Sequence, residues 1–397
     1  MEINNTKFLN VQVIYITPTT DGTPLEQMNN CLAQLSQELV NRNIDLINIV
    51  KQTIFLLAGD REEYNYKTSI FDEAINEFYE SFSPSTSFIA QAPGNDKELS
   101  LEVYVAGKRS EEIEITHKSV DDIPYTVISS PCYKEVYAAG LNVTYLNDIS
   151  DQAASSFTMM QKILAREELS FSDVVRQWNY IEEITKIAGY DTIKQNYQVF
   201  NDVRSRFYRN SDFLNGYPSA TGIGTLTGGV TIEFVAVSPG DISIYPLNNP
   251  GQIEAYKYSD EVLVGMGIPG NSRKTTPKFE RGKLLRINDH ARIYVSGTAA
   301  VVGELSSHAD DIERQTLISI ENIINLLSPD NLSKYGINVD LRTNGFSYIR
   351  TYVKYKADLE RVKRICEKHF KSENFQYLIS DICRDDLLVE IEGSIFL

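Results

Sequence analysis

Apolar residues near the start of the chain recur at the spacing of an amphipathic helix. Within residues 25–40 they share one helical face, three or four positions apart, at Leu25, Met28, Leu32, Leu35 and Leu39. Residues 44–57 are instead rich in β-branched residues, and Val50, Thr53 and Phe55 are typical of a buried strand. A second helix is expected over residues 66–79. The pattern therefore predicts the order helix, strand, helix.

The same order recurs twice farther along the chain. A second copy is expected to have helices at residues 151–167 and 194–207 and strands at residues 169–181 and 217–225. The third copy is expected to have strands at residues 294–304, 347–355 and 387–395 and helices at residues 311–327 and 358–370. Short stretches also match, since VKQ (50–52) corresponds to VRQ (175–177) and SPSTSFIA (83–90) to YPSATGIG (217–224). We interpret this as an internal repeat.

The repeat predicts an α+β fold built from three helix-on-sheet modules in one chain. We expect an N-terminal module over residues 1–140, a central module over residues 141–290 and a C-terminal module over residues 291–397. No stretch rich in Gly, Ser or Pro separates the copies. The modules are therefore expected to pack on one another as one body.

Charge and hydropathy narrow the classes of partner. The 397 residues include 38 Lys and Arg against 54 Asp and Glu, a net charge of −16, which repels a phosphate backbone and makes nucleic acid an unsuitable main partner. No apolar run approaches the length that spans a bilayer, and the first ten residues lack the layout of a signal peptide. We expect a cytoplasmic protein that binds neither nucleic acid nor membrane.

Cysteine and histidine spacing gives no sign of a metal or a disulfide framework. The four cysteines are widely spread without a CxxC pair, and the four histidines lack HExxH spacing. One GxGxxG match at residues 265–270 continues into NSRKTTP rather than a helix, so a loop is expected there instead of a dinucleotide site. We expect no metal and no cofactor.

The repeated unit resembles a known fold family. IVKQTIFL and VVRQWNYI, the helix ISIENIINLL and the closing VEIEG are similar to the YjgF/RidA fold. Single-module members of that family assemble as trimers with pockets between modules. Three copies in one chain would then form a covalent pseudo-trimer.

A narrower resemblance, to the chorismatases, extends from about residue 142 to the C-terminus. Its motifs are SFSDVVRQWNYI, YPSATGIG, NPGQIEAYKY, TPKFERG, SGTAAVVGE and DICRDDLLVEIEG. The resemblance implies a cofactor-free enzyme that removes pyruvate from chorismate in a pocket between the second and third modules. Two stretches depart from the family pattern, the loop at residues 260–274 and GELSSH at residues 303–308.

Chorismate carries an enol ether, so its cleavage needs an acid that can protonate carbon. Strand alternation in LLVEIEG places Glu390 and Glu392 on the same face, opposite Val389 and Ile391. A carboxyl held among apolar neighbours has a raised pKa and suits this task. With the resemblance we assign Glu390 as the general acid. The alternative from the residues alone is a solvated polar face.

The ring product depends on groups near the substrate ring. By resemblance, one chorismatase subgroup hydrolyses chorismate to a dihydroxycyclohexadienoate, whereas another forms 3-hydroxybenzoate and has small residues and a cysteine near the ring. Gly297 in SGTAA and Cys383 in DICRDD fit the second subgroup. The other interpretation of Cys383 is a buried, inert thiol. We therefore expect 3-hydroxybenzoate, with Glu390, Cys383 and Gly297 as catalytic residues.

The two carboxylates of chorismate need cationic or hydroxyl donors. Candidates are Arg281 in PKFERG, Arg350 in YIRTYVKY, Tyr256 in AYKY and, less directly, Thr298. Each has a structural alternative: an ion pair of Arg281 with Glu280 or Glu261, an exposed Arg350, or sheet packing of Tyr256 and Thr298.

Two other functions fit the same scaffold. An imine deaminase of the RidA type needs an arginine for the substrate carboxylate in each module, and neither SPSTSFIA nor YPSATGIG contains one. A non-catalytic protein that binds a small acid is the other alternative. For the assembly, we expect either a monomeric pseudo-trimer or a low-order homo-oligomer.

Overall fold

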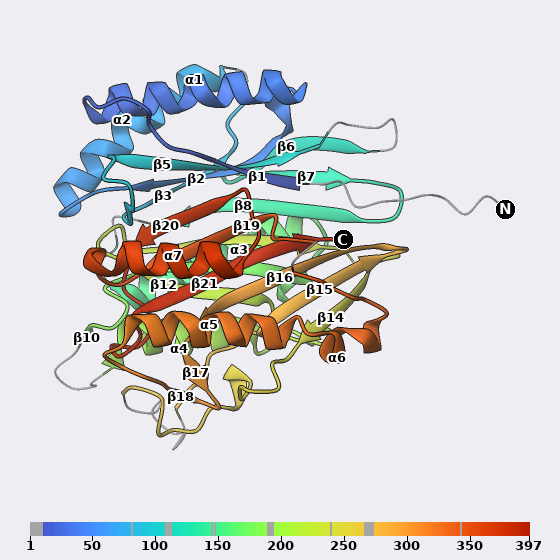
Figure 1. The fold of residues 1–397 in the computed structure, drawn as a ribbon. Helices are drawn as coiled ribbons and strands as arrows, with labels where there is room; N and C mark the ends of the chain where they lie inside the picture. The colour runs from blue at the N-terminus through green and yellow to red at the C-terminus, as the bar shows by residue number, and fades with distance from the viewer. Residues whose placement is uncertain are drawn as a thin grey trace.

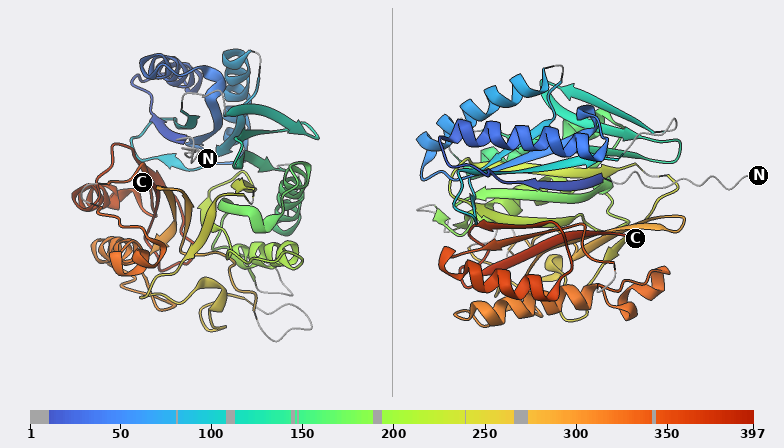
Figure 2. Two further views of the ribbon diagram at one scale, coloured as in Figure 1. Left: turned by 90° about the vertical axis from the view of Figure 1, so that its right-hand side faces the viewer. Right: turned by 45° about the horizontal axis from the view of Figure 1, so that its top comes forward.

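Three units, each a sheet with helices on its outer side, surround a common centre (Figures 1 and 2). The computed structural model describes residues 11–80, 82–107, 113–143, 146, 148–188, 194–238, 240–265, 274–341 and 344–397. Figure 2 shows the helices at the periphery and the sheets facing inward. Within the described ranges, no helix combines the length and apolarity that a bilayer crossing requires.

The first unit has a four-stranded sheet in the order β1-β5-β2-β3. Helix α2 connects β2 to β3, which pair in parallel, and the other neighbours pair antiparallel. The bounds are β1 (Val11–Ile16), α1 (Pro24–Arg42), β2 (Ile49–Leu56), α2 (Arg61–Tyr79), β3 (Ser85–Ile89) and β5 (Leu99–Ala106).

The second unit repeats this arrangement with a six-stranded sheet in the order β12-β9-β13-β8-β7-β6. Its parallel pair is β9 and β12, connected through α4. The bounds are β6 (Glu114–Val120), β7 (Ile123–Ser129), β8 (Lys134–Asn142), α3 (Ile149–Arg166), β9 (Val174–Glu182), β10 (Ile187–Ala188), β11 (Lys194–Gln195), α4 (Asn196–Tyr208), β12 (Ser219–Thr225) and β13 (Val230–Val237).

The third unit has a seven-stranded sheet in the order β14-β15-β16-β21-β19-β20-β4, whose last strand, β4 (Ala92–Pro93), comes from the first part of the chain. Its parallel pair is β19 and β20. The other bounds are β14 (Ser243–Leu247), β15 (Gly282–Ile287), β16 (His290–Ala299), β17 (Val301–Val302), β18 (Leu305–Ser306), α5 (Ile312–Leu326), α6 (Pro329–Leu332), β19 (Tyr348–Val353), α7 (Leu359–His369), β20 (Phe375–Ile379) and β21 (Val389–Phe396).

The predicted α+β class and the repeated order of helices and strands are confirmed, with ends shifted by a few residues. The helix predicted from residue 66 begins at Arg61, because the Asp60 side chain caps it by accepting a hydrogen bond from the Glu63 N–H. The sheets do not divide at the expected module boundaries after residues 140 and 290. Strands β6–β8 already belong to the second sheet and β14 and β15 to the third, because each pairs with strands that come later in the chain.

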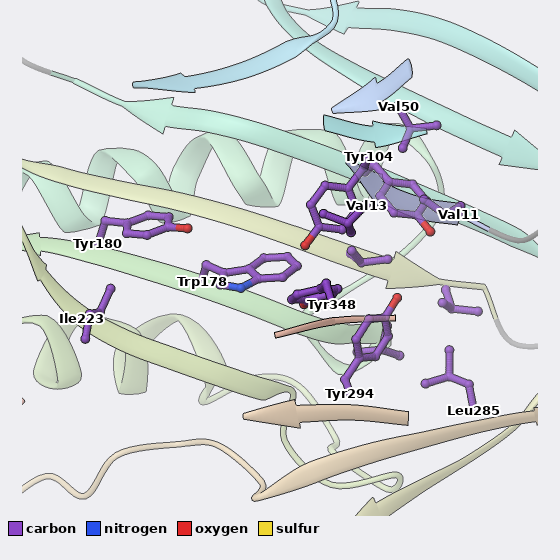
Figure 3. Packing of buried hydrophobic residues seen from close by; sticks show 14 of the residues in the cluster. Val11, Val13, Val50, Tyr104, Trp178, Tyr180, Ile223, Leu285, Tyr294 and Tyr348 are labelled. Carbon is purple, nitrogen blue, oxygen red and sulfur yellow. The ribbon is translucent and has the colours of Figure 1, made fainter. Parts of the chain in front are cut away.

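The three sheets share an apolar core (Figure 3), and charged side chains are also buried there. The Tyr104 ring of the first sheet lies 6.0 Å from the Trp178 ring of the second and 6.1 Å from the Tyr348 ring of the third, measured between ring centroids. Near these rings lies a cluster of buried charges that has one cation and one glutamate from each sheet. These are Lys51 on β2 with Glu102 on β5, Arg176 on β9 with Glu233 on β13, and Arg350 on β19 with Glu392 on β21.

The ion pairs in this core connect different sheets. Lys51 Nζ lies 2.7 Å from Glu233, Arg176 Nη2 lies 2.7 Å from Glu392, and Arg350 pairs with Glu102. Buried charges are tolerated only when they are paired and hydrogen-bonded. Each unit therefore depends on the other two to neutralise its charges.

Candidate active site

A cavity lies where the second unit meets the third. Its enclosed volume is about 60 Å³. Its walls are mostly apolar, formed in part by Val262, Leu263, Pro277, Phe279 and Leu387. A few polar groups face it, namely Tyr197, Tyr258, Cys383, Arg384 and Glu390. The structure thus brings Glu390, Cys383 and Gly297 to one cavity, as predicted.

Glu390 is the second residue of β21, between β16 and β19. As predicted, it shares a strand face with Glu392, while Val389 and Ile391 point to the opposite face and pack in the core beneath α5 and α7. Glu390 is 4% exposed and Glu392 is 1% exposed. The alternative of a solvated polar face is therefore wrong.

The Glu390 carboxyl lacks a direct contact with a described cation or hydrogen-bond donor. It forms neither a hydrogen bond nor an ion pair with a residue that the structure describes. Burial and then the charge of Glu392 raise the pKa of Glu390, whereas Arg176 and Arg281 lower it, and the outcome is a pKa of about 8. At neutral pH this carboxyl therefore carries its proton.

Glu392, two positions farther on, has the opposite protonation state. Burial alone would raise its pKa, but Arg176 and Arg350 lower it, as do hydrogen bonds from Thr221 and Trp178. Arg350 Nη1 lies 3.0 Å from its carboxylate, and Trp178 Nε1 donates to it at 2.9 Å. Neighbouring carboxyls with separated pKa values are typical of acid–base sites.

Gly297 leaves the space that the Glu390 carboxyl occupies. A Cβ atom built at this position would lie 1.9 Å from Glu390 Oε1 and 3.1 Å from Thr221 Cγ2. Its backbone N–H donates to Thr221 Oγ1 at 3.0 Å. The bulge between Val295 and Thr298 in the pairing of β16 with β21 places this backbone against the acid. A side chain here would displace the Glu390 carboxyl.

Cys383 precedes Glu390 by seven positions and lines the same cavity. Burial and then the nearby Glu390 raise the pKa of its thiol to about 12. The group is therefore a neutral thiol at physiological pH, not a thiolate nucleophile.

Of the four predicted carboxylate binders, Arg281 does not line the cavity itself but contacts Tyr258, which does. It is 6% exposed, and its Nη2 donates to the Ile253 carbonyl at 2.7 Å and to Tyr258 Oη at 2.6 Å. It forms no ion pair with a described residue, Glu261 and Glu280 included. Arg281 therefore brings positive charge to the cavity from behind Tyr258.

The other three do not line the cavity. Arg350 lies in the central ion cluster, because its strand face points to the other two sheets. Tyr256 packs against the Tyr217 ring at a centroid distance of 5.3 Å. Thr298 Oγ1 donates to the Ser296 carbonyl at 2.8 Å, which turns the hydroxyl toward its own strand. These placements are corrections to the predicted binding set.

Comparisons with known proteins identify the family to which the chain belongs. The family profile described as chorismatase FkbO/Hyg5-like, N-terminal, matches residues 116–236. A 3-hydroxybenzoate synthase from Streptomyces hygroscopicus is 31% identical over 256 residues, covering 62% of this chain and 69% of that protein. The chain belongs to the chorismatase family.

Other comparisons extend this result. A chorismatase from Streptomyces rapamycinicus is 31% identical over 233 residues, covering 57% of this chain and 64% of that protein. These two matches thus span about two thirds of each relative. A crystal structure of a chorismatase superposes with a TM-score of 0.69 at 19% identity, covering 98% of this chain and 99% of that one. The chorismatase fold thus extends over the N-terminal unit, which the sequence resemblance did not reach.

In this chorismatase-family chain, Arg204 is a buried cation that the sequence analysis missed, next to a cavity-lining residue. It is 2% exposed, it donates to Asn201, which lines the cavity, and its Nε has no hydrogen-bond partner. No described carboxylate forms an ion pair with it. On α4, four-residue spacing places Arg204 on the same helix face as Phe200 and Tyr208. A charged residue on this apolar face was the sequence signal that could have identified it.

Two further groups near the cavity were also missed. Arg384 lines it and donates to the Glu304 carbonyl at 2.8 Å, so one of the two divergent stretches helps to hold this cation. Tyr197 lies against Gly222, where a Cβ would come within 2.9 Å of its ring.

Much of the other divergent stretch, residues 266–273, lies outside the described residues. Among those described, no group of three or more His, Cys, Asp and Glu side chains is arranged to hold a metal ion.

Proposed function

We propose that this protein cleaves chorismate to pyruvate and 3-hydroxybenzoate, with Glu390 as the general acid. The observation that carries the proposal is the buried, unpartnered Glu390 carboxyl, with its pKa of about 8, in the cavity between the second and third units. The membership in the chorismatase family and the 3-hydroxybenzoate synthase relative support the choice of substrate and product.

The first step is proton transfer from Glu390 to the terminal methylene carbon of the enolpyruvyl group. This gives an oxocarbenium ion. The C4 hydroxyl oxygen then attacks C3 of the ring as the C3–O bond breaks, which releases pyruvate, returns the hydroxyl proton to the ionised Glu390 and leaves a 3,4-epoxide. Cleavage of the C4–O bond of the epoxide and transfer of a ring proton to the oxygen on C3 give 3-hydroxybenzoate. The atoms of chorismate equal those of pyruvate plus 3-hydroxybenzoate, so this outcome consumes no net water.

The cations around the cavity suit a substrate with two carboxylates. Arg281 and Arg384 flank the Tyr258 ring, with guanidinium carbons 5.7 and 5.2 Å from its centroid. Arg204 lies near the α4 wall beside Asn201. We assign one carboxylate to Arg384 and Tyr258 and the other to Arg204, because none of these arginines is paired with a described carboxylate.

The proposal is tested by incubating the purified protein with chorismate, without added metal or nucleotide. Pyruvate is coupled to lactate dehydrogenase, and the ring product is identified by mass and ultraviolet spectrum. Pyruvate with 3-hydroxybenzoate is expected. Pyruvate with a non-aromatic diol would mean hydrolysis, and no pyruvate together with tight binding of a hydroxybenzoate would favour the binding-protein alternative.

Cys383 is proposed to direct the ring product. Its neutral thiol occupies space beside Glu390 that a water molecule would otherwise fill. Cys383→Ala is therefore expected to shift the product ratio from 3-hydroxybenzoate toward the diol, measured by chromatography of the ring products. An unchanged ratio with a lower rate would remove Cys383 from product control.

A further inference from the structure

The acid Glu390 lies beside a carboxylate whose charge is fixed by the core of the whole molecule. Glu392 receives hydrogen bonds from Arg176 Nη2 at 2.7 Å and Trp178 Nε1 at 2.9 Å, and Arg350 Nη1 lies 3.0 Å away. Thr221 Oγ1 also donates to it. With this many donors, Glu392 stays ionised throughout the pH range in which Glu390 titrates.

Thr221 connects this carboxylate to the backbone that faces the acid. Its hydroxyl oxygen accepts hydrogen bonds from Arg176 Nη2 at 2.7 Å and from the Gly297 N–H at 3.0 Å while donating to Glu392. The same cluster thus fixes the charge next to Glu390 and the backbone against which the acid packs.

A comparison of the three units distinguishes glutamates that pair with the buried cations of the core from the additional glutamate at position 390. The motif residues Glu102, Glu233 and Glu392 follow an apolar residue in LE, IE and IE, and all three pair with a cation of the core. Two positions earlier, the first unit has Ser100 and the second has Thr231, whereas the third has Glu390. Each unit therefore supplies one glutamate at this motif position, and only the third unit has a second carboxyl two positions earlier on the same strand.

We propose that Glu392 is a positioning residue of the reaction, whose fixed negative charge keeps the catalytic proton on Glu390. The inference rests on the proposed function, in which Glu390 is the acid. Glu392 does not line the cavity, so it acts through Glu390 and not on the substrate. The titratable and charged groups around Glu390 come from β21, β9, the start of β15, α4 and the segment after β20; they are Glu392, Arg176, Arg281, Tyr197, Cys383 and Arg384.

Two single substitutions have opposite expected effects on the pH profile. Activity requires protonated Glu390 and is lost as the pH rises through its pKa. Glu392→Gln removes the negative neighbour and leaves Arg176 and Arg350 in excess, so the alkaline limb of kcat should move to lower pH by about one unit. Arg176→Gln removes a cation that lowers the pKa of Glu390, so the limb should move to higher pH.

Glu135→Gln is the matched control. Glu135 is equally buried and pairs with Arg292 at 2.7 Å in the same core, but it is not among the groups that act on Glu390. It should lower the melting temperature and leave the alkaline limb in place. A lower kcat with an unmoved limb in both Glu392→Gln and Arg176→Gln would overturn the proposal and leave Glu392 a structural role.

Two further measurements keep the proposal testable if a single variant does not fold or if the protein does not act on chorismate. The double variant Arg176→Gln/Glu392→Gln removes one charge of each sign, and its limb should still lie below that of the wild type, because Glu392 acts on Glu390 more strongly than Arg176 does. The Glu390 carboxyl can also be titrated by ¹³C NMR, assigned by the resonance missing in Glu390→Gln. If the wild type releases no pyruvate, the proposed function fails, and this titration still decides whether Glu392 raises the pKa of Glu390.

Discussion

At the scale of single residues, the site depends on what surrounds two identical side chains. Glu390 and Glu392 point the same way from one strand, but only Glu392 is given cationic partners. The first therefore keeps a proton at neutral pH and the second does not. The sequence predicts their shared face, but the ion pairs that separate their protonation states come from strands more than 40 and 200 positions away.

Glu390→Gln should abolish turnover while preserving the fold, because the amide has the same shape but donates no carboxylic proton. Loss of a general acid corresponds to a fall in kcat of about 10²- to 10⁴-fold, measured by pyruvate release. Wild-type activity should decline above about pH 8, the pKa of Glu390. Full activity in the variant would remove Glu390 from the mechanism.

The same substitution has a predicted effect on stability. Because the pKa of Glu390 is raised from 4.5 to about 8 on folding, its contribution favours the folded state below pH 4.5 and is lost as the pH rises toward 8. Relative to the wild type, Glu390→Gln should therefore gain melting temperature as the pH is raised across this window. Parallel melting curves at all pH values would contradict the raised pKa.

Gly297→Ala tests the close approach of backbone and acid. The new Cβ would lie 1.9 Å from Glu390 Oε1, so the carboxyl must move, and a displacement of this size costs about 10²-fold in rate. Gly251→Ala is the matched control, because its nearest neighbour, Asn249 Oδ1, would lie 3.4 Å from the Cβ. Equal kcat values in the two variants would show that the site tolerates a side chain at position 297.

At the scale of elements, local pattern was sufficient for the helices and the central strands but not for the edges of the sheets. Residues 151–167 are strongly amphipathic and form α3 almost as predicted. Strand β6 alternates weakly and lies at the edge of a sheet whose other strands come later in the chain, so its pairing could not be read locally. Arg350 was misassigned for a related reason, since its partner Glu102 is 248 positions away.

Helix α4 carries the clearest test at this scale. Arg204→Met keeps the packing length but removes the unpaired charge from the cavity side, so the KM for chorismate should rise by about tenfold or more, as expected for a lost charged hydrogen bond. Arg206→Met is the control on the same helix, because Arg206 is exposed. Equal KM values for the two variants would argue against a substrate carboxylate at Arg204.

At the scale of the whole molecule, a single chain brings two units together around the cavity. The described lining includes α4 of the second unit, β16 and β21 of the third, and the segments before β15 and before β21. We therefore propose that the monomer is active, and specific activity should stay constant on dilution while the protein elutes as a monomer of 44.9 kDa. Activity that falls with dilution would instead indicate a required homo-oligomer.

In the proposed mechanism, the ion pairs between sheets give the N-terminal unit an indirect role in catalysis. This unit contributes no residue to the described lining of the cavity, but its Glu102 neutralises Arg350, which pairs with Glu392 beside Glu390. A mutation in this unit can therefore change the chemistry without touching the substrate. Natural variation there is constrained by a reaction in which that unit takes no direct part, so its charge pairs should change together with those of the other two units or not at all.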